Sequence, residues 1–399
     1  MSAPTNWGIV ILMALGFGLV GIDRFMITTL FPVIAKDLNL DYGDIGTITG
    51  ALAFAWALAA LVMGNKADRL GSGNVLAGAL LVFALLIGAS GLATGLAGLI
   101  LVRVMMGFAD GAYAPASISA TIQAARPEYH GLAIGIQQMM LPVFGLGFVP
   151  LIITGLLHVV SWRLVFVIFA LPGFALAWLV WRKLPRTPVA DAAPSQGTFA
   201  DWKRVLAFRN VRVAMLLMLC WLTCLMTTSA LMPNYLIDHV GLEFGQMGGV
   251  MSAIGIGSAI GTVLLAWLSD QIGRKPMMLI ASAGAAAALI MLHTTGAVPT
   301  QLFLWLFLVH FFNNAAITLT VGPLCAETVP PALMATASGV VIAVGEVFGG
   351  GLAPVIAGQM AKAFGIDNLL LLPIGALALG FLLSLMLKET RPLGGAVLA

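Results

Sequence analysis

Charged residues are scarce in this chain. Asp, Glu, Lys and Arg make up 9% of its 399 residues, against about 25% in ordinary soluble domains. Hydrophobic residues make up 60%, so a water-soluble fold would have almost no polar surface. The composition therefore excludes an ordinary soluble protein, and the net charge of +3 does not indicate nucleic-acid binding.

Cysteines and the residue sets typical of enzymes are scarce as well. Cys220, Cys224 and Cys325 all lie within apolar runs, and their spacing fits neither a disulfide framework nor a zinc site. No nucleophile–histidine–acid set, metal-binding cluster or phosphate-binding loop lies near the charges of these runs. We therefore expect no enzymatic activity, no cofactor and no metal ion.

Long apolar runs dominate the sequence. A transmembrane helix needs about 17–25 mainly apolar residues. Twelve runs qualify: 8–34, 44–64, 75–94, 97–122, 131–157, 163–182, 212–237, 245–268, 276–296, 300–324, 333–360 and 368–387. The first has no Lys or Arg before it and exceeds the apolar core of a signal peptide, so we expect it to be retained. The predicted fold is an all-α membrane protein with twelve transmembrane helices.

The polar residues between the runs predict an orientation and a division. With the N-terminus inside, 14 of the 19 Lys and Arg residues fall on the cytoplasmic side and 3 on the other, which predicts that both termini are cytoplasmic. One long polar connection follows the sixth run. It divides the chain into a six-helix bundle at 1–183, a cytoplasmic linker at 184–211 and a second six-helix bundle at 212–399.

An internal repeat supports this division. Asp68 and Asp270 are 202 positions apart, and each lies in a short polar turn between two apolar runs. Paired, pseudo-symmetric halves of this kind build many secondary transporters. An acid at such a turn can pair with the N-terminus of the next helix, and rocking of the halves would break that contact. The predicted conformational-switch loops contain Gly64, Asp68, Arg69, Gly71, Asp270, Gly273 and Arg274.

Charges within the apolar runs are functional candidates, because each costs about 2.5–3.5 kcal/mol at mid-membrane on insertion scales. Asp23 and Arg24 lie in the first run, Arg103 and Asp110 share a helix face in the fourth, and Glu346 lies in the eleventh. Asp23 and Arg24 point about 100° apart, so each should reach a neighbouring helix. Such pairs either only join helices or form a switch in which an arriving anion replaces a carboxylate. Glu346 either has a functional role of this kind or forms a hydrogen bond to nearby backbone.

Uncharged polar residues form a second group of candidates. His310 shares the tenth run with Asn313 and Asn314. It either makes one interhelical hydrogen bond or carries protons. Gln137 and Gln138 lie on adjacent faces of the fifth run, so at most one of them can readily face a cavity.

The repeated turns resemble the loop signature of the major facilitator superfamily. The resemblance covers nearly the whole chain, and Ser161-Trp162-Arg163 and Glu327-x-x-Pro330 are also similar to that family. It implies two six-helix bundles related by a pseudo-twofold axis along the membrane normal.

Within that superfamily the chain resembles the anion:cation symporters, through Asp23-Arg24 in the first run and Arg103…Asp110 in the fourth. The resemblance implies protonation at Asp23 and Asp110, and anion or coupling roles for Arg24 and Arg103. Asp110 stands where these symporters usually have Glu, and Trp56 about where Tyr is common.

The sequence therefore predicts a monomeric, proton-coupled importer of a small organic anion such as a sugar acid, a monocarboxylate or an aromatic acid. Fork-shaped guanidinium groups suit carboxylates. A proton-antiport exporter, a lipid transporter and a non-transporting receptor stay open, and sodium is the alternative coupling ion. The proton-coupling candidates are Asp23, Asp110 and Glu346. The substrate-binding candidates are Arg24, Arg103, Gln137, Gln138, Trp56, His310, Asn313 and Asn314.

Overall fold

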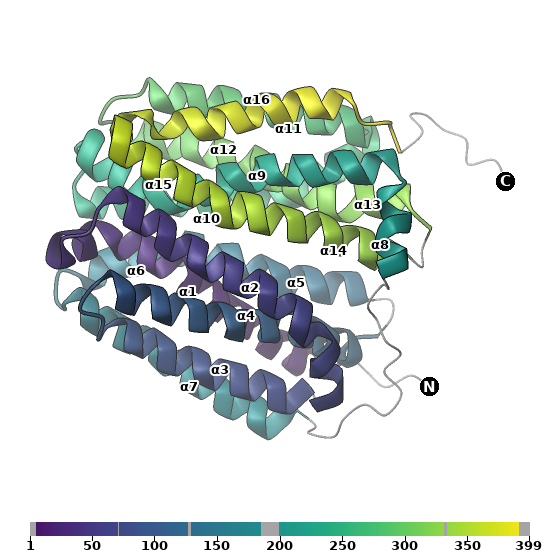
Figure 1. The fold of residues 1–399 in the computed structure, drawn as a ribbon, viewed down its shortest axis with the longest axis horizontal. Helices are drawn as coiled ribbons and strands as arrows, with labels where there is room; N and C mark the ends of the chain where they lie inside the picture. The colour runs from purple at the N-terminus through teal and green to yellow at the C-terminus, as the bar shows by residue number, and fades with distance from the viewer. Residues whose placement is uncertain (1–4, 71, 127–128, 185–198, 331–332, 391–399) are drawn as a thin grey trace.

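The computed structural model is a bundle of long helices (Figure 1). It describes residues 5–70, 72–126, 129–184, 199–330 and 333–390, with side chains described in these ranges except at 60–72, 115, 130–131, 199–201 and 335. All regular structure in the described ranges is helical, as predicted.

The first six predicted runs form helices, although the helix of the run at 75–94 already ends at Ser90 and that of the run at 131–157 ends at Leu156. Their bounds are α1 (Trp7–Leu38), α2 (Tyr42–Leu70), α3 (Ser72–Ser90), α4 (Leu96–Ala124), α5 (His130–Pro142) continued by the π-helical η2 (Val143–Phe148) and α6 (Val149–Leu156), and α7 (Trp162–Lys183). α1 has 32 residues. At 1.5 Å per residue it is about 48 Å long, enough to cross the roughly 30 Å hydrocarbon core of a bilayer.

The second six runs follow the short helix α8 (Phe199–Leu206). Their bounds are α9 (Arg209–Asn234) with η3 (Tyr235–His239), α10 (Phe244–Ile272), α11 (Arg274–His293), α12 (Pro299–Leu319) with η4 (Thr320–Leu324) and α13 (Cys325–Thr328), α14 (Met334–Val344) with η6 (Gly345–Leu352) and α15 (Ala353–Phe364), and η7 (Ile366–Leu370) with α16 (Leu371–Leu385). Eleven runs are long and apolar enough to cross a membrane on their described residues. The twelfth is α2, with 29 residues.

The helices up to α7 lie on one side of the bundle, and those from α9 onward lie on the other (Figure 1). α1 begins and α16 ends at the same end, here called the terminal side, and the opposite end is called the far side. α3, α7, α11 and α16 lie at the periphery, and large apolar side chains such as Leu85, Leu171 and Leu382 are exposed there. This surface suits a lipid environment. The division at 184–211 stays a prediction, because residues 185–198 lie outside the described ranges.

Glycines bring helices of the two sides into close contact. A Cβ on Gly46 of α2 would lie 2.3 Å from the carbonyl oxygen of Pro354 in α15. A Cβ on Gly255 of α10 would lie 2.2 Å from the backbone nitrogen of Gly147 in η2. Any larger residue would push these backbones apart, as at other membrane-helix contacts built on small residues.

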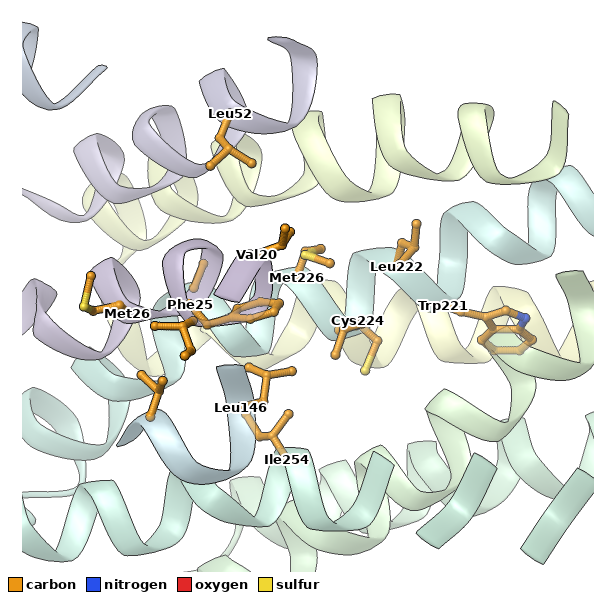
Figure 2. Packing of buried hydrophobic residues seen from close by; sticks show 14 of the residues in the cluster. Val20, Phe25, Met26, Leu52, Leu146, Trp221, Leu222, Cys224, Met226 and Ile254 are labelled. Atoms are coloured by element: carbon orange, nitrogen blue, oxygen red, sulfur yellow. The ribbon is translucent and has the colours of Figure 1, made fainter. Parts of the chain in front are cut away.

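Apolar side chains from both sides meet at the centre of the bundle. Figure 2 shows Phe25 of α1, Leu146 of η2, Met226 of α9 and Ile254 of α10 gathered in one region, and all four are buried. The charged residues of α1 and α4 lie beside this packing, so any group that reaches them leaves bulk solvent.

Candidate functional site

Asp23 of α1 and Arg103 of α4 form a buried ion pair. Arg103 Nη1 lies 3.2 Å from Asp23 Oδ1 and also donates to the Asp23 carbonyl oxygen at 3.0 Å. Arg103 Nη2 donates to Ser90 Oγ of α3 at 3.2 Å. Both charged side chains are at most 1% exposed. Arg103 is therefore held by three acceptors on two helices of one side.

Arg24 of α1 and Glu346 of η6 form a second ion pair, and this one joins the two sides. Arg24 Nη2 lies 2.9 Å from Glu346 Oε2, with the side chains 11% and 10% exposed. Arg24 also approaches Met226 Sδ at 3.7 Å and lies over the ring of Trp56, 5.5 Å from its centroid. As predicted, Asp23 and Arg24 each reach a different helix. The backbone hydrogen bond considered for Glu346 gives way to an ion pair with a residue 322 positions away.

Asp110 of α4 is buried, with 2% of its surface exposed. Its Oδ1 has no hydrogen-bond partner among the described residues, and Arg103 pairs with Asp23 instead. Burying a carboxylate without a partner is costly, whereas a neutral carboxylic acid is far cheaper to bury. The geometry therefore leaves Asp110 as a place where a proton can be held.

A small cavity of about 20 Å³ lies beside these charges. Its lining includes Arg24, Arg103, Thr28 and Thr49 from one side and Ser229 from the other. Ser229 Oγ is buried without a partner in the described part of the chain. The cavity has room for about one water molecule. Sequence reasoning missed Ser229, because one hydroxyl among many in an apolar run carries no distinguishing pattern.

The polar residues of α12 bond within the second side. His310 Nε2 lies 3.2 Å from Thr228 Oγ1 of α9, which is the single interhelical bond given as one of its two interpretations. Asn313 Nδ2 donates to the Trp221 carbonyl oxygen at 3.1 Å, and Asn314 Nδ2 donates to Ser258 Oγ. None of the three α12 residues lines the cavity beside the charges.

The two glutamines of α5 are separated from the charged cluster. Gln137 is fully buried, with its amide between Thr121 Oγ1 at 2.7 Å and Ser117 Oγ at 2.7 Å, both on α4. Gln138 is exposed. Neither lines the cavity, so Gln137 ties α5 to α4.

The second switch loop is an ion-pair network on the terminal side. Arg274 Nη2 lies 2.8 Å from Asp270 Oδ1 and 2.7 Å from Glu327 Oε1. The backbone nitrogens of Arg274 and Lys275 donate to the carboxylate of Glu389 at 2.9 and 3.0 Å. The acid at the N-terminus of α11 is thus Glu389, where a negative charge is favourable. Asp270 pairs with a side chain instead.

The turn itself depends on Gly273, whose φ of 100° favours glycine. In the first copy, Gly71 lies outside the described residues, and so do the side chains of Asp68 and Arg69. Gly64 lies within α2, which includes the backbone of Asp68 and Arg69 and ends at Leu70, so the prediction of a turn from Gly64 onward is wrong: most of these residues are helical.

Polar contacts join the two sides at the far side. Lys362 Nζ of α15 lies 2.7 Å from Asp41 Oδ2, in the loop between α1 and α2. Tyr42 Oη donates to Asp238 Oδ2 at 3.1 Å. The hydrogen bond from Lys362 holds the pKa of Asp41 below its usual value. These far-side contacts and the glycine contacts of α2 with α15 bring the two sides together there.

Long helices with an apolar periphery, two sides that meet at glycines, and buried charges between them define a multi-pass membrane carrier. A model of the Major Facilitator Superfamily matches residues 13–348. The chain belongs to this family, and within it is most like the anion:cation symporters. It is a transporter and not an enzyme.

Individual relatives agree with this assignment. The chain is 28% identical over 337 residues to a 3-(3-hydroxy-phenyl)propionate transporter of Escherichia coli (strain K12), covering 82% of this chain and 80% of that protein. It is 25% identical over 367 residues to the sialic acid transporter NanX of the same organism, covering 88% and 86%. The fold matches a bacterial homolog of the human lysosomal transporter Spinster, in an inward-facing and unoccupied conformation, with a TM-score of 0.83 and 19% identity over 97% of this chain and 98% of that chain.

Proposed function

We propose that this carrier takes up a small organic acid together with a proton across the inner membrane, with both termini in the cytoplasm. The similar proteins named above include transporters of a hydroxyphenyl propionate and of sialic acid, which both carry a carboxylate. The observation that carries the proposal is the cavity between the two sides, which is lined by an arginine of α1 and lies near buried carboxyl groups.

Arg24 is the proposed anion-binding residue. It lines the cavity, it is partly exposed, and one of its guanidinium nitrogens faces the opposite side of the bundle. Arg103 lines the same cavity but already donates hydrogen bonds to three acceptors. A carboxylate can bind a guanidinium group through two parallel hydrogen bonds. Trp56, beside Arg24, would contact an aromatic or apolar part of the substrate.

Asp110 is the proposed proton carrier, with Asp23 and Glu346 as its charged neighbours in the network. Its Oδ1 lacks a partner, whereas Asp23 is paired with Arg103 and Glu346 with Arg24. Protonation of Asp110 would leave the two ion pairs intact. Movement of either arginine toward a substrate would change the charge beside Asp110, and this would couple the proton to the anion.

The far-side contacts support an alternating-access cycle in which the structure is closed toward the outside. They join the two sides at the end opposite to the termini. The similar Spinster homolog is described as inward-facing. In the proposed cycle these contacts break when the carrier opens outward.

Transport by purified protein in proteoliposomes tests this function. The panel consists of 3-(3-hydroxyphenyl)propionate, N-acetylneuraminate and glucuronate, with 3-(3-hydroxyphenyl)propionamide as the uncharged control. We expect accumulation of at least one acid under an inward proton gradient, none of the amide, and no accumulation under a sodium gradient alone. Accumulation driven by sodium alone, or no transport of any acid, would contradict the proposal.

A further inference from the structure

The ion pair between Arg24 and Glu346 sits where the proposed substrate would bind. Both side chains are about nine-tenths buried, and they come from opposite sides of the bundle. The other ion pair described between the sides, Asp41 with Lys362, lies at the far side and is about half exposed. At mid-membrane, the carboxylate of Glu346 is thus bound by Arg24, the arginine that lines the cavity.

We propose that Glu346 is an internal substitute for the substrate: its carboxylate occupies Arg24 in the empty carrier, and the carboxylate of the substrate displaces it. This inference rests on the proposed function and assigns to Glu346 a role apart from carrying the proton. The empty carrier closes around Glu346, and the loaded carrier closes around the substrate.

The space around Arg24 supports this exchange. The cavity beside it holds about one water molecule, which is far too little for an organic acid. A substrate carboxylate can therefore bind Arg24 only when a side chain that now contacts Arg24 moves away. Glu346 has one described hydrogen bond, and it belongs to the side that separates from Arg24 when the carrier opens.

The backbone beneath Glu346 is shaped for its carboxylate. A Cβ on Gly350, in the same π-helical segment, would lie 2.6 Å from Glu346 Oε2 and 3.7 Å from Arg24 Nη2. The first distance is a clash and the second is an ordinary contact. A methyl group at position 350 would therefore push the carboxylate away from Arg24 while leaving both charges in the chain.

The role has a consequence for the transport cycle. A buried arginine without a partner opposes closure, because an uncompensated charge in the membrane is costly. Glu346 removes that cost when no substrate is bound, so net uptake, which requires the empty carrier to return, needs Glu346. Exchange of substrate for substrate does not need it, because Arg24 is occupied in both directions.

The test compares wild type, Glu346→Gln and Gly350→Ala with Glu243→Gln, a matched Glu-to-Gln control at the cap of α10, outside the cluster. The binding probe is 3-(3-hydroxyphenyl)propionate, with the other panel acids and the amide alongside. We expect both cluster variants to bind the acid about fivefold tighter or more, because an internal competitor is removed or displaced. Net uptake should fall by about tenfold while counterflow stays within about twofold of wild type, and Glu243→Gln should match wild type.

Three outcomes decide the matter. Unchanged or weaker acid binding in Gly350→Ala, measured on protein that unfolds at the wild-type temperature, overturns the internal-substitute role. A parallel fall of counterflow and net uptake in both cluster variants overturns it as well. Equal tightening of the amide would do the same, since no carboxylate is then being exchanged. Failure of wild type to bind any acid instead removes the proposed function on which the inference rests.

Discussion

The two sides of this carrier share a backbone design but differ in chemistry. With offsets of 202 to 204 residues, Arg24 corresponds to Met226, Arg103 to Phe307 and Asp110 to Asn314. The first side buries an ion pair, Asp23 with Arg103, and the carboxyl group of Asp110, whose Oδ1 has no partner among the described residues. The second side uses neutral hydrogen bonds between α12 and its neighbours α9 and α10.

What the two sides share is the way their helices approach. Val143-Phe144-Gly145 of η2 corresponds to Val347-Phe348-Gly349 of η6, 204 positions later. A Cβ on Gly145 would lie 2.3 Å from the Gly21 carbonyl oxygen of α1, and one on Gly349 would lie 2.7 Å from the Leu219 carbonyl oxygen of α9. The repeat therefore preserved close packing, while the charges in the middle of the helices are concentrated on the first side. Glu346, just before the second segment, is the exception at this depth, and the ion pairs of Arg274 lie at the terminal end of the second side.

Among the substitutions that remove this difference between the two sides, those at Arg103 are expected to have the largest effect. Arg103→Ala leaves Asp23 buried at 0% exposure without its charged partner. We expect a loss of about 3–5 kcal/mol in the free energy of unfolding, the usual cost of removing one partner of a buried pair, and no uptake. Denaturation in detergent and proteoliposome uptake measure both.

Two variants sharpen that result. Arg103→Lys keeps the charge but not the fork that reaches both Asp23 and Ser90, so it should recover part of the stability and little of the transport. Phe307→Leu, at the corresponding position of the second side, should keep both. Full transport by Arg103→Ala would contradict a central role for the pair.

The second largest effect concerns the proton and Asp110. Asp110→Asn keeps the shape of the side chain and cannot take up a proton, so accumulation against a gradient should be abolished while counterflow continues. Its counterpart Asn314→Ala should still accumulate substrate. Accumulation by Asp110→Asn at the wild-type level would contradict this assignment and would leave Asp23 or Glu346 as the residue that carries the proton.

The fold could be predicted from the sequence because it follows from patterns within short stretches of the chain. Apolar runs of membrane length and a repeated turn predict twelve helices in two related sets without knowledge of any contact. The choice of Asp23, Arg24, Arg103 and Asp110 as candidates was accessible for a similar reason, since charges in apolar runs stand out.

The pairing within the cluster was not accessible, because it depends on how helices distant in sequence are packed. Arg24 and Glu346 meet across 322 positions, through a glycine-rich segment that comes close to α9 and α2. Glu389 was missed because it lies after the last run, and only the fold brings it to the start of α11. Gln137 resembles a cavity residue in sequence, yet two hydroxyl groups of α4 satisfy its amide.

A smaller effect is expected from the neutral hydrogen bonds of the second side. His310→Gln retains a polar side chain at Thr228 but changes its geometry. We expect a loss of about 1 kcal/mol in the free energy of unfolding, typical of one hydrogen bond, with proton-driven accumulation retained. A pH-gradient response that disappears in His310→Gln, as in Asp110→Asn, would show that the second side also handles protons and would break the comparison.

The smallest effect is expected at the far side, where Asp41 meets Lys362. The pKa of Asp41 is lowered from 3.8 by the hydrogen bond from Lys362. The pair therefore stabilises the state that is closed at the far side above that pH, and this contribution is lost only as the pH falls through the lowered pKa of Asp41. A cysteine introduced by Thr49→Cys, in the cavity lining, reports opening through labelling by a membrane-impermeant maleimide. Asp41→Asn should raise the labelling rate about twofold, because exposed pairs contribute little, and by the same factor at pH 7 and pH 5. A wild-type labelling rate that rises between pH 7 and pH 5 would mean that another group, and not Asp41, sets the pH response of closure.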